Sequence, residues 1–144
     1  MITRLPYCWL AMVLLLSASC SKPALPGPKP YPVSGRVVYR GQLAKGFRVA
    51  FHPLGNQGKK IFAPSAMTDQ DGAFRLQSYA PDDGAPAGEY AVTFQWPQPL
   101  STGDPSDAAP EFDRLKGRYN DPHKSKYRVT VHESPNELEP FVLQ

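Results

Sequence analysis

Apolar and polar side chains alternate with a period of two residues through most of the chain from Val33 onward. A strand places successive side chains on opposite faces, so this period predicts half-buried antiparallel strands rather than helices. The clear runs are Val33–Arg40, Phe47–His52, Ala73–Ser78, Tyr90–Trp96 and Tyr127–His132, with weaker ones over Ile61–Thr68 and Glu137–Leu143. Seven short strands without a long helical pattern predict an all-β fold, a seven-stranded β-sandwich over residues 33–144.

The N-terminal residues have the pattern of a secretory signal, which we assign to residues 1–19. Arg4 supplies a positive start, and the apolar run Tyr7–Leu16 is too short to span a bilayer and ends in small residues. This signal resembles that of bacterial lipoproteins, in which the cysteine after the small residues, here Cys20, is lipidated and becomes the new N-terminus. Ordinary signal cleavage without a lipid is the alternative.

Residues 20–32 follow the signal as a lipid-anchor cysteine and a Pro-rich spacer. The five prolines of "SKPALPGPKPYP" favour an extended, semi-rigid segment that holds a folded domain away from a membrane. In such lipoproteins, an Asp directly after the lipidated cysteine favours another destination than the outer membrane. This chain has Ser21 there, so the same resemblance indicates the outer membrane of a Gram-negative cell. We therefore expect an extracytoplasmic lipoprotein of the outer membrane, facing the periplasm or the cell surface.

Cysteine content and charge narrow the possible partners. Cys8 and Cys20 are the only cysteines and both belong to the signal region, so the mature domain has no disulfide and depends on an apolar core. A formal net charge of +3 without a basic run longer than two residues argues against a nucleic-acid partner. The expected partners are the membrane, through the lipid, and an unknown envelope protein or glycan; no cofactor is expected.

One long region interrupts the strand pattern. Residues 97–125 contain five prolines and no alternation, and within them "PEFDRLKG" predicts a short helix with Pro110 in its first turn and Gly117 just past its end. Long insertions of this kind more often carry function than short turns do. We therefore expect contacts from this loop and from the turns around Asp82 and Asn56.

Two acidic turns are candidate cation sites. "DQDG", starting at Asp69, begins like a calcium loop, but the twelfth position, where such a loop needs a glutamate, is Ala80. The alternation also resumes directly after Gly72, so this segment predicts a tight, bulged hairpin turn. The second turn, with Asp82, Asp83 and Glu89, is interpreted as a solvated connection.

Other residue patterns that would indicate a metal site or a catalytic site are weak in this chain. His52, His123 and His132 have no metal-like spacing, so no metal site is predicted. No serine lies in a nucleophile-elbow sequence, and no Gly-rich phosphate loop is present, so no catalytic residue is predicted.

Aromatic side chains beside the loops are the best candidates for ligand contact. They are Trp96, Phe112 and Tyr119, with Tyr79 as a further one. Exposed rings of this kind stack on sugars. The alternative is structural: Trp96 ends a core strand, and Tyr119 covers the edge of a sheet.

Three stretches together resemble one family: "VSGRVVYRGQLAKGFRVAF", "AMTDQDGAFRL" with "APAGEYAVTF", and the closing "RYNDPHKSKYRVTVHESPNELEPFVL". They are similar to the carboxypeptidase regulatory-like, or transthyretin-like, β-sandwich of small bacterial lipoproteins, most specifically at Thr68–Phe74 and Pro86–Tyr90. The resemblance implies a seven-stranded Greek-key sandwich and usually no activity of its own.

Enzymes of similar architecture differ from this chain in their motifs. Hydroxyisourate hydrolases end in Tyr-Arg-Gly-Ser, whereas this chain ends Phe141-Val142-Leu143-Gln144, and the paired tyrosines and histidines of intradiol dioxygenases are not recognisable. We therefore expect a non-catalytic, envelope-anchored module for binding or scaffolding. The alternatives are a carbohydrate-binding module and a small hydrolase or metal-dependent enzyme on a transthyretin-like fold.

Overall fold

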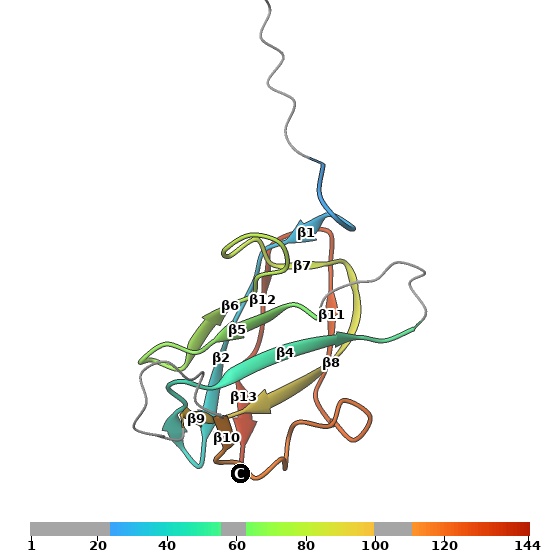
Figure 1. Cartoon of the computed structure of the whole chain (residues 1–144). Helices are drawn as coiled ribbons and strands as arrows, with labels where there is room; N and C mark the ends of the chain where they lie inside the picture. Colours follow the sequence, from blue (N-terminus) through green and yellow to red (C-terminus); the bar gives the residue numbers. More distant parts are fainter. Residues whose placement is uncertain (1–23, 56–62, 100–110) are drawn as a thin grey trace, which may run out of the picture.

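The computed structural model describes residues 24–55, 63–99 and 111–144, and these form an all-β fold (Figure 1). Thirteen strands and no helix are found in this part of the chain. The strands are β1 Pro30–Tyr31, β2 Val33–Tyr39, β3 Gln42–Leu43, β4 Arg48–Pro53, β5 Ser65–Met67, β6 Ala73–Arg75, β7 Ala85–Pro86, β8 Gly88–Gln95, β9 Pro97–Pro99, β10 Glu111–Asp113, β11 Arg128–Val131, β12 Asn136–Glu137 and β13 Phe141–Leu143.

Two larger sheets pack face to face in a sandwich-like arrangement. One has the order β11-β8-β4-β5, and the other is centred on β2, which pairs with β3, β6, β12 and β13. Two small sheets, β1–β7 and β9–β10, extend the ends. The all-β prediction is confirmed, but the predicted count of seven strands is lower than the thirteen found in the described residues.

The predicted inward faces form the core. The buried residues on the predicted inward faces are Val33 and Val37 of β2, Val49 and Phe51 of β4, and Tyr90, Val92 and Phe94 of β8. Aromatic contacts join the two sheets: the ring centroids of Phe51 and Phe74 lie 6.5 Å apart, and those of Phe94 and Phe141 lie 5.2 Å apart. Each buried ring stabilises the fold by a few kcal/mol, at about 25 cal/mol per Å² of apolar area removed from water.

The predicted short helix, which was expected to begin at Pro110 and to end before Gly117, is wrong. Glu111–Asp113 forms β10, paired antiparallel with β9, and turns follow as far as Tyr119. Lys116, the last residue of the expected helix, has a φ of 53°, and this left-handed conformation does not belong to an α-helix. Pro110, the expected first residue of the helix, lies outside the described residues.

The last predicted strand, Glu137–Leu143, is two strands. Both β12 and β13 run parallel to β2, which differs from the antiparallel arrangement expected from the alternation. Pro140 lies between them and has no N–H to donate to a ladder, which explains the break.

The two ends of the sandwich differ in what they carry (Figure 1). β1 and β7 lie at one end, and β9, β10 and the C-terminus lie at the other. Pro30–Tyr31, expected in the spacer, forms β1 and pairs with β7. The signal and Cys20 lie outside the described residues, and within those residues no helix is long and apolar enough to cross a membrane.

Candidate functional site

The segment Asp69–Gly72 is a tight turn. One carboxylate oxygen of Asp69 accepts hydrogen bonds from the N–H groups of Asp71 (2.8 Å) and Ala73 (2.9 Å). Gly72 has a φ of 69°, and a Cβ there would lie 2.4 Å from the Val37 carbonyl oxygen, so only glycine fits. The turn was predicted correctly, but it is not a hairpin of one sheet, because β5 pairs with β4 while β6 pairs with β2.

The second acidic turn is also structural. The carboxylate of Asp83 accepts hydrogen bonds from the N–H groups of Ser78 (2.6 Å), Tyr79 (3.0 Å) and Ala80 (3.0 Å). Asp83 therefore stabilises the main chain of this turn, and that role needs no bound cation. In the described residues, no group of three or more His, Cys, Asp or Glu side chains could hold a metal ion.

The histidines do not come together in a recognisable site. His123 and His132 are exposed, whereas His52 is half-buried on the outer face of β4, with its Nε2 2.9 Å from Thr93 Oγ1. Burial lowers the pKa of His52 below 6.5, because desolvation disfavours the charged imidazolium. His52 is therefore neutral at pH 7.

Trp96 is partly buried and packs against the core. Its ring stacks on Phe47, with centroids 5.0 Å apart and planes at 22°, and the Arg114 guanidinium lies 3.7 Å from its centroid. Two groups stacked this closely must occupy opposite faces of the ring. Phe47 and Arg114 therefore cover the two faces of the Trp96 ring.

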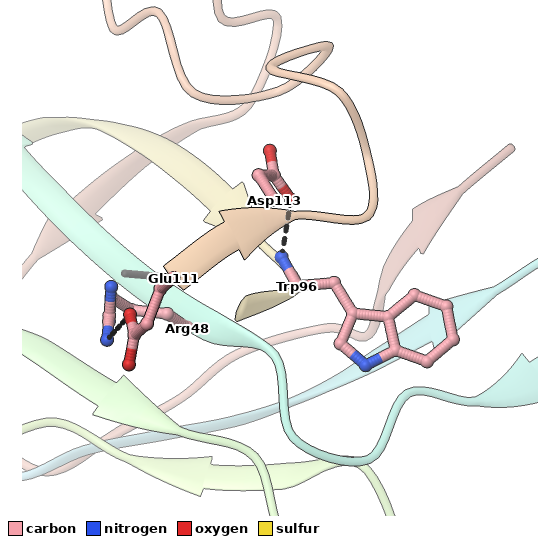
Figure 2. Close-up of polar contacts among 4 residues, drawn as sticks. All are labelled: Arg48, Trp96, Glu111 and Asp113. Carbon is pink, nitrogen blue, oxygen red and sulfur yellow. Dashed lines mark hydrogen bonds and ion pairs between the residues drawn. The ribbon is translucent and has the colours of Figure 1, made fainter. Parts of the chain in front are cut away.

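Asp113 builds the turn from which Arg114 covers the Trp96 ring, and Figure 2 shows the contact of Asp113 with the Trp96 main chain. Its carboxylate accepts hydrogen bonds from the main-chain N–H groups of Trp96 (2.8 Å), Leu115 (3.0 Å) and Gly117 (3.0 Å). Two residues earlier, Glu111 forms an ion pair with Arg48 at 2.9 Å (Figure 2). These contacts connect the turn to β4 and β8.

Phe112 and Tyr119 lie at the same end of the sandwich but differ in exposure. Phe112 is 46% exposed on β10. Tyr119 covers a sheet edge, because its carbonyl accepts the N–H of Phe94 (3.0 Å) and its hydroxyl accepts the N–H of Gln144 (3.1 Å). Of the three predicted contact residues, Phe112 presents the most accessible ring.

A cluster of exposed cations surrounds this end and was not predicted. We call it the basic end; its residues are Arg114, Lys116, Arg118, Lys124 and Lys126. The nearby carboxylates are engaged: Glu111 by Arg48, Asp113 by three amides, and Asp121 by the His123 N–H and by Lys124 at 3.6 Å. The sequence places a cation at every second position of residues 114–118 and of residues 124–126, and this spacing could have predicted the cluster.

Tyr119 and Tyr127 help to line a small hollow in the basic end. Its volume is about 210 Å³, and Arg118, Lys124 and Lys126 contribute to its wall. The opposite end of the sandwich carries the exposed carboxylates Asp82, Glu89, Glu133 and Glu137. Charge is therefore distributed unequally along the molecule, although the net charge is small.

A larger groove lies between β5 and β6, where the two sheets part. Its volume is about 850 Å³, and Arg36, Arg48 and Arg75 line it together with Met67 and Phe74. Sequence reasoning missed it because the three arginines come from three separate strands of two sheets.

Comparisons with known proteins leave the family open. No family model matches the chain, and no curated protein does. Similar solved structures include a 9R-lipoxygenase from Cyanothece (12% identity, 87% of this chain and 18% of that chain, TM-score 0.46). A DUF3823 family protein from Parabacteroides merdae follows (17% identity, 78% of this chain and 45% of that chain, TM-score 0.41).

A Pseudomonas aeruginosa protein described as carbohydrate-binding is also similar (12% identity, 80% of this chain and 89% of that chain, TM-score 0.42). The chain thus spans less than half of the first two proteins. At these identities and TM-scores the neighbours assign neither a family nor a function to this chain.

Proposed function

We propose that this chain is a non-catalytic, envelope-anchored β-sandwich domain of the carboxypeptidase regulatory-like type, with a seven-stranded Greek-key core, that binds or scaffolds a partner outside the cytoplasm. A lipid on Cys20 holds it to the outer membrane, and the Pro-rich spacer connects the lipid to β1. The secretory pattern of residues 1–19 and the small residues before Cys20 support this location.

The observation that carries the proposal is the position of the basic end. The chain enters the sandwich at β1, and the basic end lies at the opposite end, beside β10 and the C-terminus (Figure 1). A domain tethered near β1 therefore presents these five exposed cations to whatever lies beyond the membrane surface. Such a surface fits an anionic partner, because complementary charge steers association and suppresses wrong partners.

The test is cross-linking in cells that carry the full-length protein. The variant Lys124→Glu/Lys126→Glu reverses two charges of the basic end, and Lys29→Glu, a reversal near β1, is the matched control. We expect one envelope component to be cross-linked by the wild type and the control and to be lost from the double variant. Equal recovery from all three proteins would refute the basic end as the contact surface.

A carbohydrate-binding module is the second candidate, and the exposure of Phe112 favours it. This function predicts that glycan affinity falls in Phe112→Ala and Tyr119→Ala, since ring stacking provides much of the binding energy at such sites. Trp96→Ala should lower thermal stability instead, because that ring packs on Phe47. Glycan affinity unchanged in both Phe112→Ala and Tyr119→Ala would exclude this candidate.

An enzyme on a transthyretin-like fold remains the third proposal. It predicts a stoichiometric transition metal or a measurable hydrolytic turnover in the purified full-length protein. Elemental analysis of protein purified without chelators is the direct measurement. A metal-free protein without turnover on ester and amide substrates would end this proposal.

A further inference from the structure

The groove between β5 and β6 is closed at both ends by main-chain hydrogen bonds. Ser65 and Gln77 exchange two N–H···O bonds of 3.1 and 3.0 Å at one end, and the Asp69 N–H donates to the Ala73 carbonyl at 2.9 Å at the other. Counting inward from both ends places Met67 opposite Arg75. In the described part of the chain no ladder joins β5 to β6 between these points, so the strands part there.

Main-chain N–H and C=O groups of β5 and β6 point into the groove between the two strands. Thr68 donates its N–H to Phe47 in β5's own sheet, and Leu76 donates to Val33 in the other sheet. Successive residues of a strand direct their N–H and C=O groups to opposite sides. Met67 and Arg75, next to these residues, therefore direct their main-chain groups into the groove and offer both donors and acceptors to a bound molecule.

Three guanidinium groups line the same groove. Arg36 is paired in register with Ala73, and Arg75 with Ser34, so the two arginines are diagonal neighbours on one face of the β2–β6 pair. Arg48 approaches from β4 in the other sheet, and Glu111 holds it at 2.9 Å. Among the described residues, neither Arg36 nor Arg75 has a carboxylate within 4.0 Å.

Asp69, Asp82 and Glu137 line the groove as well, and in the described part of the chain none of these carboxylates lies within 4.0 Å of Arg36 or Arg75. Asp69 uses one carboxylate oxygen for two amides of its own turn. Glu137 is paired in register with Ser34 from the far side of β2, so one whole strand separates it from Arg75. Glu137 should therefore weaken an incoming anion by repulsion rather than occupy its place.

We infer that the β5–β6 groove is a binding site for a small anionic ligand whose carboxylate or phosphate groups are held by Arg36 and Arg75. The planar guanidinium presents paired donors that match both oxyanions. A volume of about 850 Å³ lies within the range of small-molecule sites, about 300–1,000 Å³. This site is independent of the basic end, which lies on other residues.

The experiment is calorimetric titration of the full-length protein, purified in detergent, with citrate in one arm and inorganic phosphate in the other. Saturable binding of citrate alone identifies a carboxylate site, and binding of phosphate alone identifies a phosphate site. We expect Arg36→Gln/Arg75→Gln to weaken the bound anion roughly tenfold or more, since each charged hydrogen bond lost is large. Glu137→Gln should tighten the same anion severalfold.

The matched control is Lys124→Gln/Lys126→Gln, which removes two cations of the basic end and should leave the affinity unchanged. Circular dichroism establishes that each variant is folded. The inference is overturned if neither anion binds the wild type in the millimolar range, or if the arginine variant binds as tightly as the wild type. Failure of this titration would not refute the proposed function. That function depends on the basic end and is tested separately by cross-linking.

Discussion

Replacing Asp113 gives a quantitative test of the turn that covers Trp96. Its carboxylate accepts three main-chain N–H bonds, two on Oδ1 and one on Oδ2. A net contribution of about 0.5–1.5 kcal/mol for each bond predicts that Asp113→Ala lowers the free energy of unfolding by about 3 kcal/mol. Asp113→Asn keeps the oxygen that accepts two of the bonds and should cost about 1 kcal/mol.

The assay is urea unfolding of a soluble form that lacks residues 1–20, followed by circular dichroism and by Trp96 fluorescence. Asp71→Ala is the matched control, because Asp71 is exposed and its carboxylate makes no hydrogen bond to the described residues. The control should change the free energy of unfolding by less than about 0.5 kcal/mol. If Asp113→Ala behaves like the control, or if Asn costs as much as Ala, the carboxylate does not hold this turn.

Three further predictions concern single buried or strained positions. Gly84→Ala should separate β1 from β7, because Gly84 has a φ of 91° and its Cβ would overlap the Tyr31 carbonyl; faster hydrogen exchange at Tyr31 is the readout. Because burial lowers the pKa of His52, stability should fall as the pH drops below about 6.5, and His52→Gln should flatten that dependence in urea unfolding. Burial raises the pKa of Tyr90 to about 12, so stability should fall above about pH 10. Tyr90→Phe should remove this loss at high pH. At pH 7 the same variant should cost about 1–2 kcal/mol, since the Pro86 carbonyl loses its hydrogen-bond donor.

The alternation of side chains was enough to predict which residues face the core. Val33, Val37, Phe51 and Val92 are all buried on the faces that the sequence assigned to them. The rule weakens at β8, where Ala91 and Thr93, expected on the polar face, are buried as well. A strand in the middle of a sheet can be covered on both sides, and a period of two residues does not reveal that.

The predicted helix is wrong because of contacts between distant parts of the chain, and such contacts also decide the surroundings of Trp96. A proline before and a glycine after "EFDRLK" satisfy local rules for a helix, but pairing with β9 and the bonds to Asp113 are tertiary contacts that local rules omit. Trp96 lies beside a loop in the sequence. In the fold, Phe47 and Arg114, which are distant from it along the chain, cover its ring.

The sequence by itself determined that the chain is all-β, which side chains form its core, and that Asp69 and Gly72 make a turn. These properties depend on the spacing of neighbouring residues and on local backbone geometry. Only the tertiary structure decided that Arg36, Arg48 and Arg75 line one groove and that the cations of residues 114–126 gather opposite β1. Both arrangements depend on how strands from distant parts of the chain pair and on where the sheets part, and the spacing of neighbouring residues does not encode those distances.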